Sequence, residues 1–149
     1  MTIDEYLNQL KALERREERL YKKYCEIEEK ATSPQTYNFG SGAPRGRNGN
    51  NTRENLLVEL ADASNEFNAA FEEYKNFRNR LQRNIYNLLY WQGLIIEQVY
   101  IYNRNRDNDL YGVNELLFTD DRREILAKLD EAKAALAEIL RAQGVEIES

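Results

Sequence analysis

The feature that most constrains this chain is a pair of apolar stripes with helical spacing, separated by one segment rich in helix breakers. The first stripe lies within residues 3–31 and the second within residues 56–91, and in both the apolar residues recur at steps of three and four. That spacing places the apolar side chains on one face of an α-helix. The first stripe consists of Ile3, Tyr6, Leu10, Leu13, Leu20, Tyr24, Ile27 and Ala31, and the second of Leu56, Leu60, Ala63, Phe67, Ala70, Tyr74, Phe77, Leu81, Leu88 and Trp91.

The segment between the stripes, residues 32–51, predicts a flexible loop. It is rich in Gly, Pro, Asn and Ser and has no apolar periodicity. Thr2 and Glu5 have capping-box spacing at the start of the first helix, and Asn51 or Thr52 can cap the second. Two helices with one stripe each bury those stripes most simply as an antiparallel hairpin. The second stripe is rich in aromatic residues, so a third helix or a second copy could also pack on the hairpin.

The pattern changes after residue 85. Apolar residues occupy nearly every face of residues 85–102, which is typical of a buried helix. A polar loop (103–109), a short segment (110–117) and a last helix from Asp120 to about Arg141 follow, with Thr119 as the expected cap of that helix. The predicted fold is therefore all-α: a long antiparallel helical hairpin (1–91), a small C-terminal helical subdomain resembling a degenerate helix-turn-helix (85–143) and a polar tail (144–149).

The inventory of reactive side chains is poor. The chain has no histidine, and its single cysteine, Cys25, allows no intramolecular disulfide. Two carboxylate pairs, Asp107 with Asp109 and Asp120 with Asp121, are more typical of a solvated loop and of the first turn of a helix than of a cation site. We therefore expect a protein that is not an enzyme and that uses no metal or cofactor.

Charge and hydropathy bound the surroundings in which the chain works. The N-terminus lacks the basic-then-apolar pattern of a signal peptide, and no apolar run is long enough to span a membrane. A cytoplasmic protein without membrane contact is therefore expected. The net charge is −5, and residues 92–149 carry twelve acids against seven bases, so the acidic excess lies in the C-terminal part.

The order of parts in residues 110–136 is that of a helix-turn-helix: a short helix, a turn with a hydroxyl cap and a longer helix. Together with the opening Thr2-Ile3-Asp4-Glu5-Tyr6-Leu7 and the Gly49-Asn50-Asn51-Thr52-Arg53-Glu54 segment, this order resembles small phage and prophage regulators of the ArpU and RinA kind, which activate late genes. The resemblance is best over residues 1–80. It implies a transcriptional regulator with a C-terminal domain similar to region 4 of sigma factors, which binds DNA or RNA polymerase.

Under that resemblance, the DNA-binding side chains would be Arg122, Arg123 and Lys128 of the last helix, with Arg104 and Arg106 reaching flanking phosphates. The chain departs from the family pattern at Leu110 and Asn114, where relatives carry tryptophan and alanine. Residues 119–131 also hold five acids against three bases. This composition keeps a second hypothesis open: a non-enzymatic interaction protein that binds and inhibits or adapts a host protein complex, for example in bacterial defence, by presenting an acidic surface similar to nucleic acid.

The residues expected to contact a protein partner are three clustered tyrosines and the two acids at the start of the last helix: Tyr100, Tyr102, Tyr111, Asp120 and Asp121. Half-buried core tyrosines are the alternative interpretation of that cluster. A structural coiled-coil protein is the third functional class that the sequence allows. In each case the apolar stripes favour a homo-oligomer.

Overall fold

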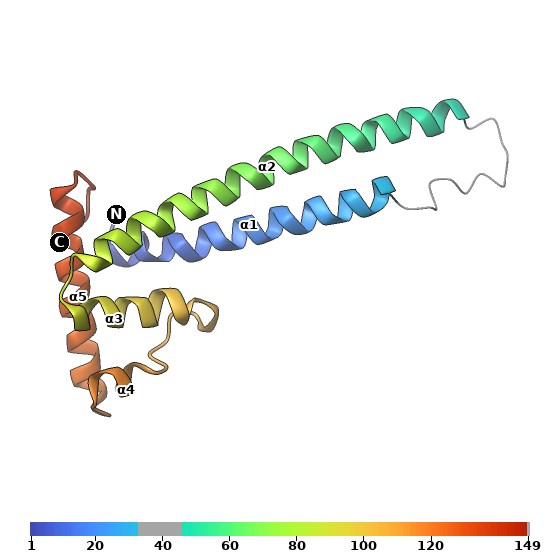
Figure 1. The fold of residues 1–149 in the computed structure, drawn as a ribbon. Coiled ribbons are helices and arrows are strands. Elements are labelled where there is room, and N and C mark those ends of the chain that lie inside the picture. The colour runs from blue at the N-terminus through green and yellow to red at the C-terminus, as the bar shows by residue number, and fades with distance from the viewer. Residues whose placement is uncertain (33–45, 149) are drawn as a thin grey trace. The chain divides into compact units, whose positions relative to one another are not determined.

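The computed structural model describes residues 1–32 and 46–148, with residues 46–52 described by their backbone alone, and every regular element within those ranges is helical (Figure 1). This confirms the all-α fold and the packed pair of long N-terminal helices followed by short C-terminal ones. None of the described helices is long and apolar enough to cross a membrane. The elements are α1 (Ile3–Thr32), α2 (Gly46–Tyr86), α3 (Tyr90–Ile96), the π-helix η2 (Glu97–Tyr102), the 3₁₀-helix η3 (Arg104–Arg106), α4 (Val113–Leu117) and α5 (Arg122–Ala142).

The predicted capping box at the start of α1 is confirmed. The Thr2 backbone N–H donates to Glu5 Oε2 at 3.2 Å, and the Glu5 backbone N–H donates to Thr2 Oγ1 at 3.1 Å. Each side chain therefore satisfies a backbone donor that the first turn leaves without a partner.

The bounds of α2 differ from the prediction at both ends. The helix begins at Gly46, several residues before the expected caps Asn51 and Thr52, so the predicted loop 32–51 is wrong over its last residues, while residues 33–45 lie outside the described ranges. The helix ends at Tyr86 instead of continuing to Trp91, which belongs to α3.

Local contacts explain the break between α2 and α3. The Leu89 backbone N–H donates to the Gln92 side chain at 3.2 Å, which caps the start of α3. Gly93 then lies directly against the end of α2, where an added Cβ would meet Ile85 Cγ2 at 3.1 Å and the Ile85 carbonyl oxygen at 3.2 Å. The chain can turn back this closely because residue 93 has no side chain.

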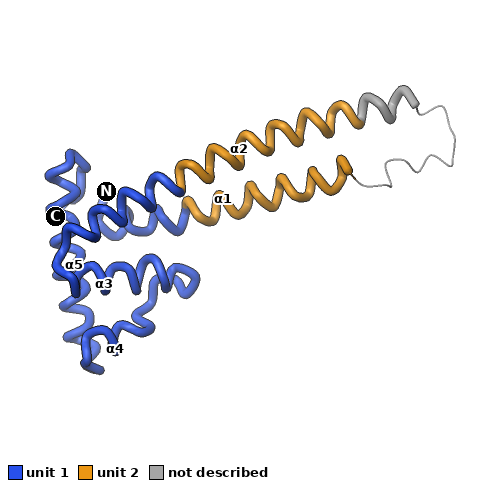
Figure 2. The backbone as a smooth tube through the Cα atoms, viewed as in Figure 1, with its two compact units in different colours: residues 1–12, 75–149 blue, residues 13–74 orange. Residues whose placement is uncertain are grey.

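The described chain forms two compact units (Figure 2): unit 1, Met1–Ala12 with Lys75–Ser149, and unit 2, Leu13–Tyr74. Unit 2 is an antiparallel helix pair, because Arg16 pairs with Glu73 at 2.8 Å while the later Lys23 pairs with the earlier Glu66 at 3.6 Å. The start of α1 and the end of α2 belong to the same unit as the C-terminal helices.

Unit 1 is organised around the apolar segment after α2. As predicted, this segment is buried: Ile95, Ile96, Val99 and Ile101 are at most 4% exposed. α3 packs on α5 and α4, and α4 also packs on α5. The remaining fully buried side chains of the unit come from α1, α2, α4 and α5: Leu7, Leu10, Leu81, Val113, Leu136 and Leu140.

The end of the chain is also part of unit 1. Gly144 has a φ of +89°, which suits glycine after a helix end. The expected polar tail is only partly polar, because Ile147 is buried and the Glu148 backbone N–H donates to the Met1 carbonyl at 2.8 Å. The Gln143 amide donates to buried Asn84 at 2.6 Å, which joins the end of α5 to α2.

Candidate interaction surface of the C-terminal helices

The turn between α4 and α5 positions the exposed start of α5. The helix is capped by Asp121, whose carboxylate accepts from the Arg123 backbone N–H at 3.0 Å. The prediction of Thr119 as the cap is wrong, because Thr119 lies two residues before Asp121. Its hydroxyl accepts from the Asp121 backbone N–H at 3.2 Å and donates to Glu124 at 3.1 Å. Phe118 has a left-handed backbone (φ +54°) and its side chain is 94% exposed. The turn therefore holds a large apolar ring in solvent at the entrance to α5.

The five bases predicted to contact DNA differ in their surroundings. Arg122 and Arg123 are exposed in the first turn of α5. Lys128 instead lies over the Trp91 ring, 4.7 Å from its centroid, and is only half-exposed. A cation held over an indole is already engaged within the fold.

The two arginines after the π-helix are also held within unit 1. Arg104 donates to the Ile101 carbonyl. Arg106 pairs with Asp109 at 3.1 Å and lies 4.2 Å from the centre of the Tyr111 ring. These contacts fix the loop after η2, so three of the five predicted DNA contacts have structural partners.

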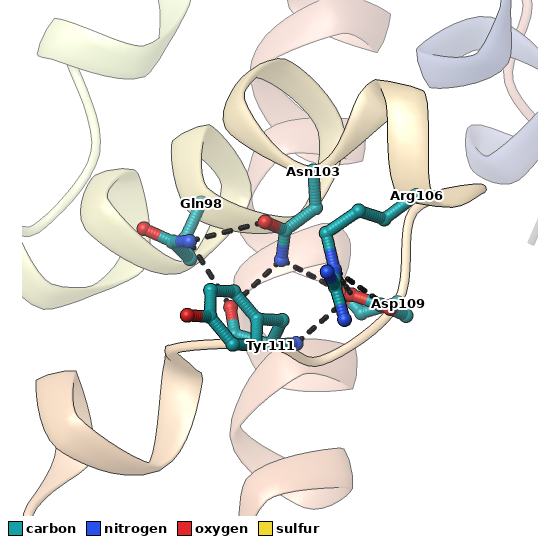
Figure 3. A network of polar contacts seen from close by, with 5 residues as sticks. All are labelled: Gln98, Asn103, Arg106, Asp109 and Tyr111. Atoms are coloured by element: carbon teal, nitrogen blue, oxygen red, sulfur yellow. Dashed lines mark hydrogen bonds and ion pairs between the residues drawn. The ribbon is translucent and has the colours of Figure 1, made fainter.

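A polar network fixes that loop (Figure 3). The side chain of Asn103, 2% exposed, donates to the carbonyls of Asp109 at 3.0 Å and Tyr111 at 2.8 Å, and it accepts from the Gln98 amide at 3.2 Å. Gln98 also donates to the Tyr111 carbonyl at 3.0 Å. Figure 3 shows the Arg106 side chain reaching Asp109 in the same loop. The network explains the Asn/Arg/Asp-rich sequence as a loop built by its own side chains.

The predicted partner contacts divide into exposed and buried residues. Tyr102 and Tyr111 are 64% and 63% exposed. Tyr100 is 7% exposed, and its hydroxyl donates to Asp4 at 3.2 Å, so its prediction as a surface contact does not fit its burial. Asp120 is exposed and accepts from the Asn114 amide at 3.2 Å, whereas Asp121 is the helix cap.

Tyr100 belongs to a polar cluster that joins α1, η2 and α5. Lys133 donates to Asp4 at 2.9 Å and also lies 3.6 Å from Asp130. Burial raises the pKa of Tyr100. Burial alone would lower the pKa of Lys133, but the hydrogen bond and charge of Asp4, together with Tyr100 and Asp130, leave that pKa raised. The protonated forms of Lys133 and Tyr100 hold this cluster together, so its role is structural.

The outward face of α5 is acidic and partly apolar. We use "outward face" for the exposed residues opposite the buried Ile125, Leu129 and Ala132 stripe. The face contains two bases and four acids, together with three apolar side chains. Its members are Arg123, Glu124, Leu126, Ala127, Asp130, Glu131, Ala134, Glu138 and Arg141.

Aromatic side chains at the α2–α3 junction form a second exposed group. Tyr86, Leu89 and Tyr90 are 77%, 61% and 83% exposed. They adjoin Trp91, which carries Lys128 of α5 on its ring. The exposure of Leu89 and Phe118 was missed, because an apolar residue beside a helical stripe is ordinarily expected in the core.

The paired carboxylates have cationic or backbone partners where their contacts are described. Asp107 pairs with Lys11, and Asp109 pairs with Arg106. No group of three potential metal-ligating side chains occurs among the described side chains of residues 1–32 and 53–148.

Comparison of the chain with protein-family models, with curated proteins and with solved structures finds no match in any of the three.

Proposed function

We propose that this chain is a non-enzymatic regulator that binds a protein partner through α5 and the turn that precedes it. The observation that carries the proposal is the chemistry of the outward face of α5, where Leu126 and Ala127 lie beside Asp130 and Glu131. Phe118 extends this surface with an almost fully exposed ring. Exposed aromatic and aliphatic groups bordered by charge are typical of the energetic centre of a protein interface.

The acidic charge suits a basic protein surface and opposes a DNA backbone. A recognition helix in a major groove places its first turns among phosphates, where each carboxylate is repelled. The resemblance to phage and prophage transcriptional regulators makes RNA polymerase the first partner to test. A host protein that itself binds nucleic acid would present the same basic chemistry.

Duplex DNA is the second candidate, and the α4–turn–α5 order favours it. In that arrangement Arg122 and Arg123 would be the phosphate contacts, since Lys128, Arg104 and Arg106 are engaged elsewhere. Two arginines support only weak, sequence-independent attraction.

The test is binding of the immobilised full chain to purified RNA polymerase, with duplex DNA measured in parallel. Leu126→Asp places a charge in the outward face, and Ala69→Asp places one on an exposed position of α2 in unit 2 as the matched control. Because residues at the centre of an interface contribute about 2 kcal/mol or more, we expect Leu126→Asp to weaken polymerase binding by at least about tenfold, with no change for the control.

A different result would instead support DNA as the partner: the chain binds duplex DNA, the Arg122→Ala/Arg123→Ala double variant loses that binding, and Leu126→Asp keeps it. If neither polymerase nor DNA binds, RNA polymerase is excluded as the partner, and the basic host proteins are tested with the same pair of variants.

A further inference from the structure

The two sides of the helix pair in unit 2 differ in chemistry. On α2 the stripe Leu56, Leu60, Ala63, Phe67 and Ala70 faces α1. An α-helix turns by about 100° per residue. The residue directly after each stripe position therefore lies on one side of the helix pair, and the residue directly before it lies on the other side.

The preceding residues form a closed, ion-paired side. On α1 they are mostly basic and on α2 they are mostly acidic. Two ion pairs bridge the helices here, Arg16 with Glu73 at 2.8 Å and Lys23 with Glu66 at 3.6 Å. The charged members of this side are Arg16, Arg19, Lys23, Glu26 and Lys30 on α1 and Glu59, Asp62, Glu66 and Glu73 on α2.

The residues that follow the stripe positions form an open side, which carries no charge on α2 within unit 2. On α2 they are Leu57, Ala61, Ser64, Asn68 and Phe71, and none of them is ionisable. Leu57 is 51% and Phe71 41% exposed. From α1, Tyr21 packs on Phe67 with ring centroids 5.2 Å apart, yet it is still 52% exposed. One side of the pair thus leaves three large apolar side chains partly in solvent, with the uncharged Ala61, Ser64 and Asn68 between Leu57 and Phe71 on α2.

The charged residues of the open side of unit 2 are all acidic. On α1 the positions after the stripe hold Glu14, Glu18 and Glu28 around Tyr21 and Cys25, and within residues 13–74 no base directly follows a stripe position on either helix. The resulting negative field is visible nearby: burial and the charges of Glu18 and Glu14 raise the pKa of Glu17.

We propose that the open side of unit 2 binds an amphipathic helix of another protein whose apolar stripe is flanked by lysine or arginine. The apolar stripe of the partner helix would pack against Tyr21 of α1 and against Leu57 and Phe71 of α2. Its flanking bases would lie near the glutamates of α1. Laying an amphipathic helix along a helix pair is an established mode of recognition, and it completes a three-helix bundle. A second copy of this chain fits less well, because two open sides brought together contain no base to neutralise the glutamates. This inference goes beyond the partner proposed for α5, because it concerns unit 2.

The test uses the full chain and a designed fluorescent peptide of about three heptads, with leucine at the a and d positions and lysine on the flanks. A second peptide carries glutamate on the flanks. Two chain variants add the same charge to the same residue type on α2: Ala61→Arg on the open side and Ala69→Arg on the closed side. Both positions are exposed, so both variants should keep the helical content of the wild type.

Anisotropy titrations should show the lysine-flanked peptide binding at least about tenfold more tightly than the glutamate-flanked one. Ala61→Arg should weaken that binding about tenfold, and Ala69→Arg should change it by less than about threefold. Equal effects of the two variants would mean diffuse attraction to an acidic protein and would overturn the proposal. So would a wild-type dimer in light scattering that Ala61→Arg converts to a monomer, because the open side would then be occupied by a second copy. Leu126→Asp, the variant for the α5 partner, should leave peptide binding unchanged.

Discussion

Removing the Asn103 side chain is the sharpest test of how the loop after η2 is held. Asn103→Ala deletes two donated hydrogen bonds, to the Asp109 and Tyr111 carbonyls, and one accepted from Gln98. At a net contribution of about 0.5–1.5 kcal/mol for each bond, the loss lies between about 1.5 and 4.5 kcal/mol. The Tyr111 carbonyl keeps the Gln98 donor, so only the Asp109 carbonyl is left without its partner, and we expect a loss of about 2–4 kcal/mol.

The assay is urea unfolding followed by circular dichroism, with hydrogen exchange of residues 104–112 measured in parallel. Asn103→Asp keeps the shape of the side chain but cannot donate to the two carbonyls when ionised, so at neutral pH it should be at least as destabilising as alanine. Asn105→Ala, an exposed change in the same loop, should alter the free energy of unfolding by less than about 0.5 kcal/mol. A loss below about 1 kcal/mol for Asn103→Ala, with unchanged exchange in the loop, would refute the reasoning.

Two further predictions concern unit 1. Gly93→Ala should destabilise the chain by about 1–3 kcal/mol, because its Cβ would press on the Ile85 carbonyl at 3.2 Å. The same change in an unhindered helix stabilises by about 0.5–1 kcal/mol, so a rise in melting temperature would contradict the close contact. The pKa values of Lys133 and Tyr100 are both raised in the folded chain, so their contribution to stability is fully present below their unfolded values near about 10 and is lost as pH rises through the folded values. The melting temperature should therefore fall more steeply above pH 10 in the wild type than in Asp4→Asn, and identical alkaline profiles would show that the cluster is not coupled to folding.

The sequence predicted the elements that depend on local pattern. The capping box at Thr2 and Glu5, the two apolar stripes and the buried segment around Ile95 and Val99 all follow from spacing and composition. Their signal is strong because each stripe repeats over several turns of helix.

The elements that depend on contacts between distant residues could not be predicted in the same way. The break after Tyr86 interrupts a continuing apolar pattern, and it needs both the Gln92 cap and the close approach of Gly93 to Ile85. The π-helix Glu97–Tyr102 has no comparable signature in composition. Burial of Ile147 in an otherwise polar tail depends on the distant N-terminus.

The candidate site shows the same limit at the level of single residues. Arg106 and Lys128 are plausible DNA contacts in the sequence because both are bases near or within the predicted helix-turn-helix. Their contacts with Asp109, Tyr111 and Trp91 depend on the tertiary structure. The position of Tyr100 in the core likewise depends on distant residues, because its hydroxyl donates to Asp4, which also pairs with Lys133.

The most direct test of the central claim, that α5 recognises protein instead of DNA, is the salt dependence of duplex binding by the full chain. Arg122 and Arg123 are the two bases in the first turn of α5, and Arg141 at the other end of the helix donates to the Ile147 and Glu148 carbonyls. The slope of log affinity against log salt concentration should therefore not exceed about 2 in magnitude, with no preference among DNA sequences. A slope of about 6 or more, together with discrimination between two duplexes of different sequence, would contradict the account.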